Sequence, residues 1–209
     1  MASQKKLTES FKRLRKNLNR AETLLKKFFD QPGGMPRRRG QPQAHEQELL
    51  RSVLVLAIGA LDAFLSELLV ELMPRIAEES TDAAVFERIA KDNPGLILRS
   101  LFLGAVERNE ALSEAIQAHF HAKVMHGAKA VRQVSTWCAL GLGDQAYDLP
   151  TRPNVLSLTD EWTDKRHRIV HQGELVKMTR QDAAEIIECV AAIGKTLNAK
   201  AIEKLFRGR

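Results

Sequence analysis

Three side chains close together in the stretch 155–173 have the types that could do chemistry. They are Arg166, His167 and His171. The guanidinium of arginine keeps its charge at neutral pH and matches the geometry of a phosphate, so Arg166 could bind an anionic group. An imidazole titrates near neutral pH, so His171 or His167 could act as a general base or a general acid. The stretch therefore has the groups for proton transfer at a phosphate.

These side chains must be positioned by a helix, because apolar residues recur along 155–171 at helical spacing. The predicted apolar stripe comprises Val155, Leu158, Trp162 and Ile169. Arg166 lies on this stripe, where a permanent charge needs a partner or a ligand. His167 and His171 are four residues apart and share another face, and Arg166 and His171 are about 140° apart on an ideal helix. This separation favours a site shared between two such helices.

Structural roles are the alternative for the same residues. Arg166 could form a buried salt bridge with Asp62, which stands in the middle of another apolar segment and needs a partner if it is buried. His167 and His171 could simply interact favourably with the helix C-terminus.

No competing catalytic set stands out. His119, His121 and His126 cluster without a metal-ligand pattern, and a surface or polar-interface role suits them better. Cys138 and Cys189 stand alone in apolar helical contexts, so we expect small core residues. No P-loop or nucleophile elbow is present. We therefore expect neither a metal nor a cofactor.

Helical periodicity extends over most of the chain. Gly (12), Pro (7) and aromatic residues (5%) are sparse, which disfavours a β-barrel or sandwich. The fold class is predicted to be all-α, a single bundle of five to seven helices with a long central helix at 44–79, where Pro74 suggests a kink or a break. The other predicted helices span 4–30, 81–91, 95–107, 110–140, 154–171 and 179–206. Thr179 is the expected N-cap of the last helix, with Asp182 in the capping-box position.

The positive charge is concentrated at the N-terminus. Residues 1–40 contain 12 Lys and Arg against three acidic residues, a net of +9, whereas the rest of the chain has a net of −3. We divide the chain into a basic helix (1–30), a loop rich in Pro, Gly and Arg (31–43) and a helical domain (44–209), within one domain overall. The basic segment could contact nucleic acid or could be a solvated helix face.

Targeting and membrane signals are weak. The N-terminus lacks an apolar signal segment. The most apolar run, 52–73, is interrupted by Asp62, Glu67 and Glu71, which makes it a poor membrane span. We expect a soluble, cytoplasmic protein in a reducing compartment, with no membrane partner.

The segment 166–171 resembles the R-(polar)-x-x-x-H signature of the HEPN superfamily of helical domains. The segment 56–65, with Asp62, resembles the family's central helix, and the Gly173 stop followed by the Thr179-led helix resembles the helix after the motif. The resemblance covers most of the chain loosely and is nearest to stand-alone bacterial HEPN proteins, including the RiboL-PSP type. One departure is His167, where many members have Asn.

The resemblance implies a metal-independent endoribonuclease that is a homodimer with a composite active site. Arg166 would stabilise the phosphorane, and His171 would act as base or acid. His167 would orient the phosphate or His171, or transfer a second proton. Asp62 and Asp164 would hold Arg166 in position. The expected products carry a 2′,3′-cyclic phosphate and a 5′-hydroxyl.

Further RNA contacts are expected from Lys165 and Arg168 beside the motif, and from Arg37, Arg38 and Arg39 in the loop. The resemblance also implies a toxin or anti-phage effector, with an antitoxin or regulatory protein as a possible partner. Two alternatives remain. One is a non-catalytic helical module that binds RNA or a protein, with the Arg/His motif kept for structure. The other is a dimeric scaffold.

Overall fold

The computed structural model describes residues 7–29, 44–79, 114, 118 and 125–206. In this part of the chain the structure has five α-helices and a short 3-10 turn, η1 (Asp144–Tyr147), and no strand. The helices are α1 (Glu9–Phe29), α2 (Ala44–Glu79), α6 (Gly127–Trp137), α7 (Val155–Gln172) and α8 (Arg180–Phe206). The prediction of an all-α fold is confirmed.

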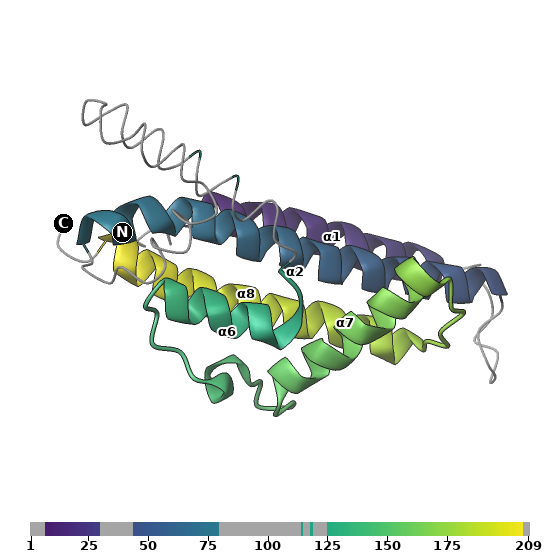
Figure 1. Ribbon diagram of the computed structural model, residues 1–209. Helices are drawn as coiled ribbons and strands as arrows, with labels where there is room; N and C mark the ends of the chain where they lie inside the picture. The colour runs from purple at the N-terminus through teal and green to yellow at the C-terminus, as the bar shows by residue number, and fades with distance from the viewer. Residues whose placement is uncertain (1–6, 30–43, 80–113, 115–117, 119–124, 207–209) are drawn as a thin grey trace.

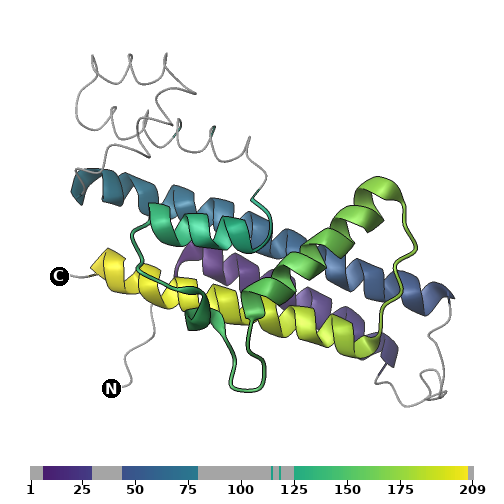
Figure 2. The same ribbon diagram turned by 60° about the horizontal axis from the view of Figure 1, so that its bottom comes forward.

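The helices form one bundle around α2, which contacts each of the other four helices. Helices α1, α2 and α8 pack side by side along the long axis (Figure 1), and α7 crosses α2 and α8 obliquely (Figure 2). Side chains such as Leu54, Leu61, Phe64 and Leu68 make α2 apolar on most of its circumference and are buried. The predicted central helix is confirmed at both ends, and it continues through Pro74.

Part of this helix, Ala44–Met73, is long and apolar enough to cross a membrane by length and composition alone. Within the fold, 56% of its most apolar stretch is buried. The core helix of a soluble protein has the same properties, so this is weak evidence for a membrane span.

The basic helix α1 is anchored in the bundle. The carboxylate of Glu71 accepts hydrogen bonds from the backbone N–H groups of Glu9 and Ser10, both at 3.2 Å. A carboxylate is favourable there because the helix N-terminus has unpaired donors and a positive dipole. The buried Asn198 of α8 accepts hydrogen bonds from Thr8, at 3.1 Å from its backbone nitrogen and 2.9 Å from its hydroxyl. Helix α1 is thus tied to both α2 and α8.

The prediction of one helix over 110–140 is wrong at its centre. His126 is extended, and Gly127 has a φ of +66°, so a helix cannot continue from residue 125 through these two residues. Helix α6 begins at Gly127 and ends at Trp137, since Ala139 and Gly141 also have positive φ. The sequence predicted that this helix ends at Gly141, but it did not predict the break at Gly127.

The predicted capping box of α8 is present. The hydroxyl of Thr179 accepts a hydrogen bond from the N–H of Asp182 at 3.0 Å, and the Asp182 carboxylate accepts one from the N–H of Thr179 at 2.7 Å. Without these bonds, the backbone N–H groups of Thr179 and Asp182 would be unpaired donors at the start of the helix.

We expect Thr179→Ala to lower the free energy of unfolding by about 1 kcal/mol, because it removes one of these two caps. Urea denaturation measures this loss. Thr179→Ser keeps the hydroxyl and is expected to be close to wild type. Equal stability of Thr179→Ala and wild type would show that the capping box contributes nothing.

Several predicted features lie outside the described residues. They are the helices at 81–91 and 95–107, the loop 31–43 with Arg37, Arg38 and Arg39, and His119 and His121.

Candidate functional site

Helix α7, which presents the Arg/His motif, is fixed at both ends. Its first turn is capped by Asp148, whose carboxylate accepts a hydrogen bond from the N–H of Val155 at 3.1 Å. Its last turn closes at Gly173 in the left-handed conformation, as predicted. The following segment is tied to α2, since buried Gln47 exchanges two hydrogen bonds, of 2.8 and 2.9 Å, with the backbone of Met178.

Arg166 is half-buried on the inner side of α7. Its Nε atom is buried and has no hydrogen-bond partner among the described residues. The sequence predicted an arginine on an apolar stripe, and the structure places it close enough to Asp62 of α2 for its charge to act on that carboxylate. A guanidinium cannot lose its charge, so Arg166 needs a negative charge nearby, although its Nε atom is itself enclosed by protein.

Asp62 faces the same region from the middle of α2. Its Oδ2 atom lies 2.8 Å from Nδ1 of His126, and its buried Oδ1 atom has no hydrogen-bond partner in the described part of the chain. Burial raises the pKa of Asp62 from 3.8 to about 6, against the lowering effect of His126 and, more weakly, of the Arg166 charge. Arg166 therefore influences Asp62 electrostatically, but no ion pair joins these two residues. The salt bridge considered from the sequence does not form.

A close contact between α6 and α7 holds His126 beside Asp62. The carboxylate of Asp160 on α7 accepts a hydrogen bond from the N–H of Ala128 at 2.7 Å, in the first turn of α6. Gly127 permits this approach, because a Cβ there would lie 2.5 Å from Oδ1 of Asp160. The positive φ of Gly127 and this contact both disfavour any larger residue. His126, the residue just before α6, is thereby directed at α2.

His167 and His171 lie on the outer side of α7. Both are exposed, and their ring centroids are 4.8 Å apart. Two apolar residues nearby in sequence are also exposed, Val170 by 45% and Leu175 by 75%. Within one chain the motif is therefore divided, with Arg166 on the inner side and the two histidines outside.

The other predicted residues of this region have structural contacts. The ammonium group of Lys165 lies 3.9 Å from the centroid of the Trp162 ring, a cation–π contact. Arg168 forms an ion pair with Glu174, which follows the end of α7. Asp164 is exposed, and its charge acts on Arg168. It makes no ion pair with Arg166 within the described residues.

His126 is the residue of this region that sequence reasoning missed. It was grouped with His119 and His121, and nothing local connects it to Asp62, which is 64 residues away. A usable signal was the requirement that a buried Asp62 find a partner, combined with Gly127 directly after a histidine.

The raised pKa of Asp62 predicts a specific pH dependence of stability. The folded chain holds the Asp62 proton up to about pH 6, whereas the unfolded chain releases it near 3.8, so the wild type loses stability as pH rises through this window. Asp62→Asn cannot ionise and escapes this loss. We expect its stability relative to wild type to increase between about pH 4 and 7, by up to about 3 kcal/mol.

Urea denaturation at a series of pH values measures this difference. Asp144→Asn is a suitable control because the Arg132 guanidinium lowers the pKa of Asp144, which gives the opposite sign. Because Asp144 titrates at or below about pH 3.8, that variant should lose stability relative to wild type only as pH rises toward 3.8, and its difference from wild type should be nearly constant between pH 4 and 7. A constant difference between Asp62→Asn and wild type across the window would contradict the burial of a titrating Asp62.

No group of three or more His, Cys, Asp or Glu side chains that could hold a metal ion occurs in the described ranges. The chain was compared with family models, curated proteins and solved structures, and nothing in any of the three matches it.

Proposed function

We propose that this chain is a metal-independent endoribonuclease of the HEPN type, as the resemblance of segment 166–171 implies. The observation that carries this proposal is the state of Arg166. Its charge lies next to the Asp62–His126 pair, and its buried Nε donor has no partner in the described part of the chain. If the guanidinium turns toward solvent, a phosphate group is a suitable acceptor for this unused donor.

The reaction would begin with the 2′-hydroxyl of the ribose. His171 or His167 takes its proton, and the resulting oxygen attacks the adjacent phosphorus. Arg166 stabilises the negative charge of the phosphorane. The bond from phosphorus to the 5′-oxygen then breaks, and the other imidazole, in its protonated form, gives a proton to that oxygen. The products are a 2′,3′-cyclic phosphate and a 5′-hydroxyl.

The roles of Asp62 and His126 follow from their contacts. Above about pH 6 the Asp62 carboxylate is ionised and only accepts hydrogen bonds, so the donor in the 2.8 Å contact is then Nδ1 of His126. The negative charge of Asp62 would then attract the guanidinium of Arg166 and keep it on this side of α7. We regard both as positioning residues.

A site shared by two chains is part of the proposal, because the resemblance implies a homodimer and the motif is divided within one chain. Arg166 and His171 lie on different sides of α7, and Val170 on this helix and Leu175 just after it are exposed apolar residues, as an interface would require. In a homodimer with two α7 helices face to face, the histidines of the two chains would meet, and Arg166 would join them only if its guanidinium turned outward from its own bundle.

Two measurements test this proposal. End analysis of RNA cleaved in EDTA should find 2′,3′-cyclic phosphates and 5′-hydroxyls, and 5′-phosphate ends would contradict the mechanism. Mixing Arg166→Ala chains with His171→Ala chains should restore about a quarter of wild-type activity, since half of the dimers would have one intact site. No restoration would mean that each site lies within one chain.

A non-catalytic helical module that binds RNA or protein is the second candidate. The inward position of Arg166, with both histidines outside, favours it. Under this alternative, RNA would be bound but remain intact, and Arg166→Ala would reduce stability without affecting any cleavage. The biological setting of a toxin or anti-phage effector, with an antitoxin or regulator, is proposed from the resemblance alone.

A further inference from the structure

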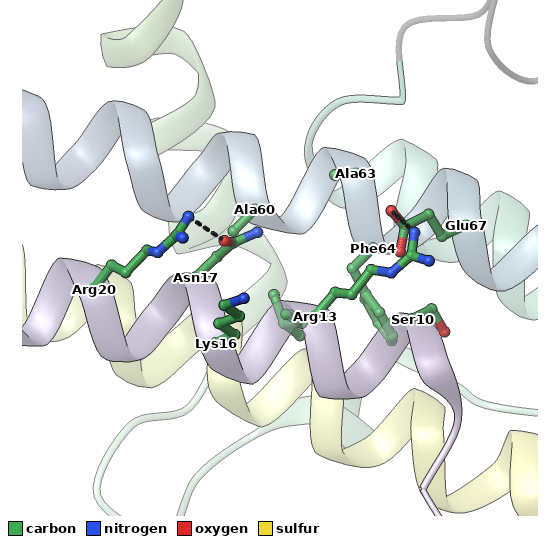
Figure 3. Close-up of a pocket in the computed structure, with 10 residues that line it drawn as sticks. Ser10, Arg13, Lys16, Asn17, Arg20, Ala60, Ala63, Phe64 and Glu67 are labelled. Carbon is green, nitrogen blue, oxygen red and sulfur yellow. Dashed lines mark hydrogen bonds and ion pairs between the residues drawn. The ribbon is translucent and has the colours of Figure 1, made fainter.

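A groove runs between α1 and α2, on a part of the bundle that the Arg/His motif does not use. Its volume is about 280 Å³. Buried Leu14 and Phe64 form its floor. On the α2 side it is lined by the small side chains of Ala60 and Ala63, which leave the groove open. Figure 3 shows basic side chains along the α1 wall.

The α1 wall presents three cations at regular helical spacing, Arg13, Lys16 and Arg20. Successive cations are three or four residues apart, so they stand on neighbouring turns, about 5 Å apart along the axis. Lys16 has no partner among the described residues, and Arg20 reaches only the neutral Asn17, at 3.5 Å. Arg13 pairs with Glu67 at 3.1 Å but remains 68% exposed. With Glu67 as the acidic group, the groove has a net charge of +2.

We propose that this groove binds the phosphate backbone of single-stranded nucleic acid. A row of cations at regular spacing matches a ligand that has one negative charge at every repeat, and guanidinium groups match phosphates in geometry. The groove exposes no aromatic ring for base stacking, since Phe64 is buried. Binding should therefore depend strongly on salt and only slightly on base sequence. This inference concerns binding and does not require that the chain cleave RNA.

The test compares Lys16→Gln/Arg20→Gln with its parent, using fluorescence anisotropy of a labelled 12-mer of oligouridylate. Both proteins also have Arg166→Ala and His171→Ala, so no cleavage can disturb the measurement. We expect about tenfold weaker binding at low salt from the loss of two charged contacts. The slope of log K against log salt concentration should fall by about 1.4, because each phosphate contact contributes about 0.7 for single strands.

The matched control is Lys177→Gln/Lys195→Gln, which removes two exposed charges outside the groove. Its affinity for the oligonucleotide, and its slope of log K against log salt concentration, should stay close to those of the parent. Equal losses in both double variants would mean a general effect of net charge and would overturn the proposal, as would unchanged binding in the groove variant.

A second experiment tests whether the groove binds an acidic protein segment instead of nucleic acid. Poly-glutamate of equal charge is added as a competitor to the parent protein. We expect it to displace the oligonucleotide only at much higher concentration. Displacement at equal concentration would overturn the proposal in favour of an acidic protein segment.

Discussion

His171→Ala is expected to slow RNA cleavage by about 10²- to 10⁴-fold, the usual contribution of one proton-transfer group. The ring of His171 is exposed and near the end of α7, so the fold should be unaffected by its loss. The measurement is the initial rate of cleavage of a labelled single-stranded RNA by wild-type and variant protein in the same buffer. Circular dichroism should show equal helix content.

His45→Ala is a matched control, because His45 is also an exposed histidine on a helix but lies at the start of α2. It should cleave at the wild-type rate. If His171→Ala cleaves as fast as His45→Ala, then His171 transfers no proton, and His167 becomes the first candidate for the base.

Phe64→Ala is expected to reduce the free energy of unfolding by about 3–5 kcal/mol, the usual cost of removing a buried phenylalanine ring. Phe64 is 1% exposed and lies in an edge-to-face contact with Phe11, with ring centroids 6.2 Å apart. This contact joins α2 to α1, so the large loss expected here depends on α1 being packed in the bundle. Urea denaturation at neutral pH measures the loss.

Leu56→Ala provides the comparison on the same helix, since Leu56 is 43% exposed. Its cost should stay below about 1 kcal/mol. Similar costs for both variants would contradict the packing of α1 against this face of α2.

The elements that could be predicted from sequence are those with local signals. The apolar positions of α2 surround most of the helix, and both of its predicted ends are confirmed. Gly173 and the Thr179–Asp182 pair mark the end of α7 and the start of α8 by backbone chemistry that involves only neighbouring residues.

The parts that could not be predicted depend on contacts between distant segments. The break before α6 requires Asp160 to hold the first turn of that helix, and Asp160 lies 32 residues from Ala128. In the same way, the periodicity of α7 places Arg166 on an apolar stripe but does not reveal that Asp62 would bond to His126 instead. The anchoring of α1 depends on Glu71 and Asn198, far from it in sequence.

The central claim is that the chain cleaves RNA without a metal by means of Arg166. The most direct measurement is the cleavage rate of labelled single-stranded RNA in excess EDTA, with wild-type and Arg166→Ala proteins prepared in parallel. We predict that the wild type cleaves at a rate unaffected by the chelator and that the variant is slower by about 10²- to 10³-fold. Intact RNA after prolonged incubation with a high concentration of wild-type protein, or equal rates for the two proteins, would contradict the claim.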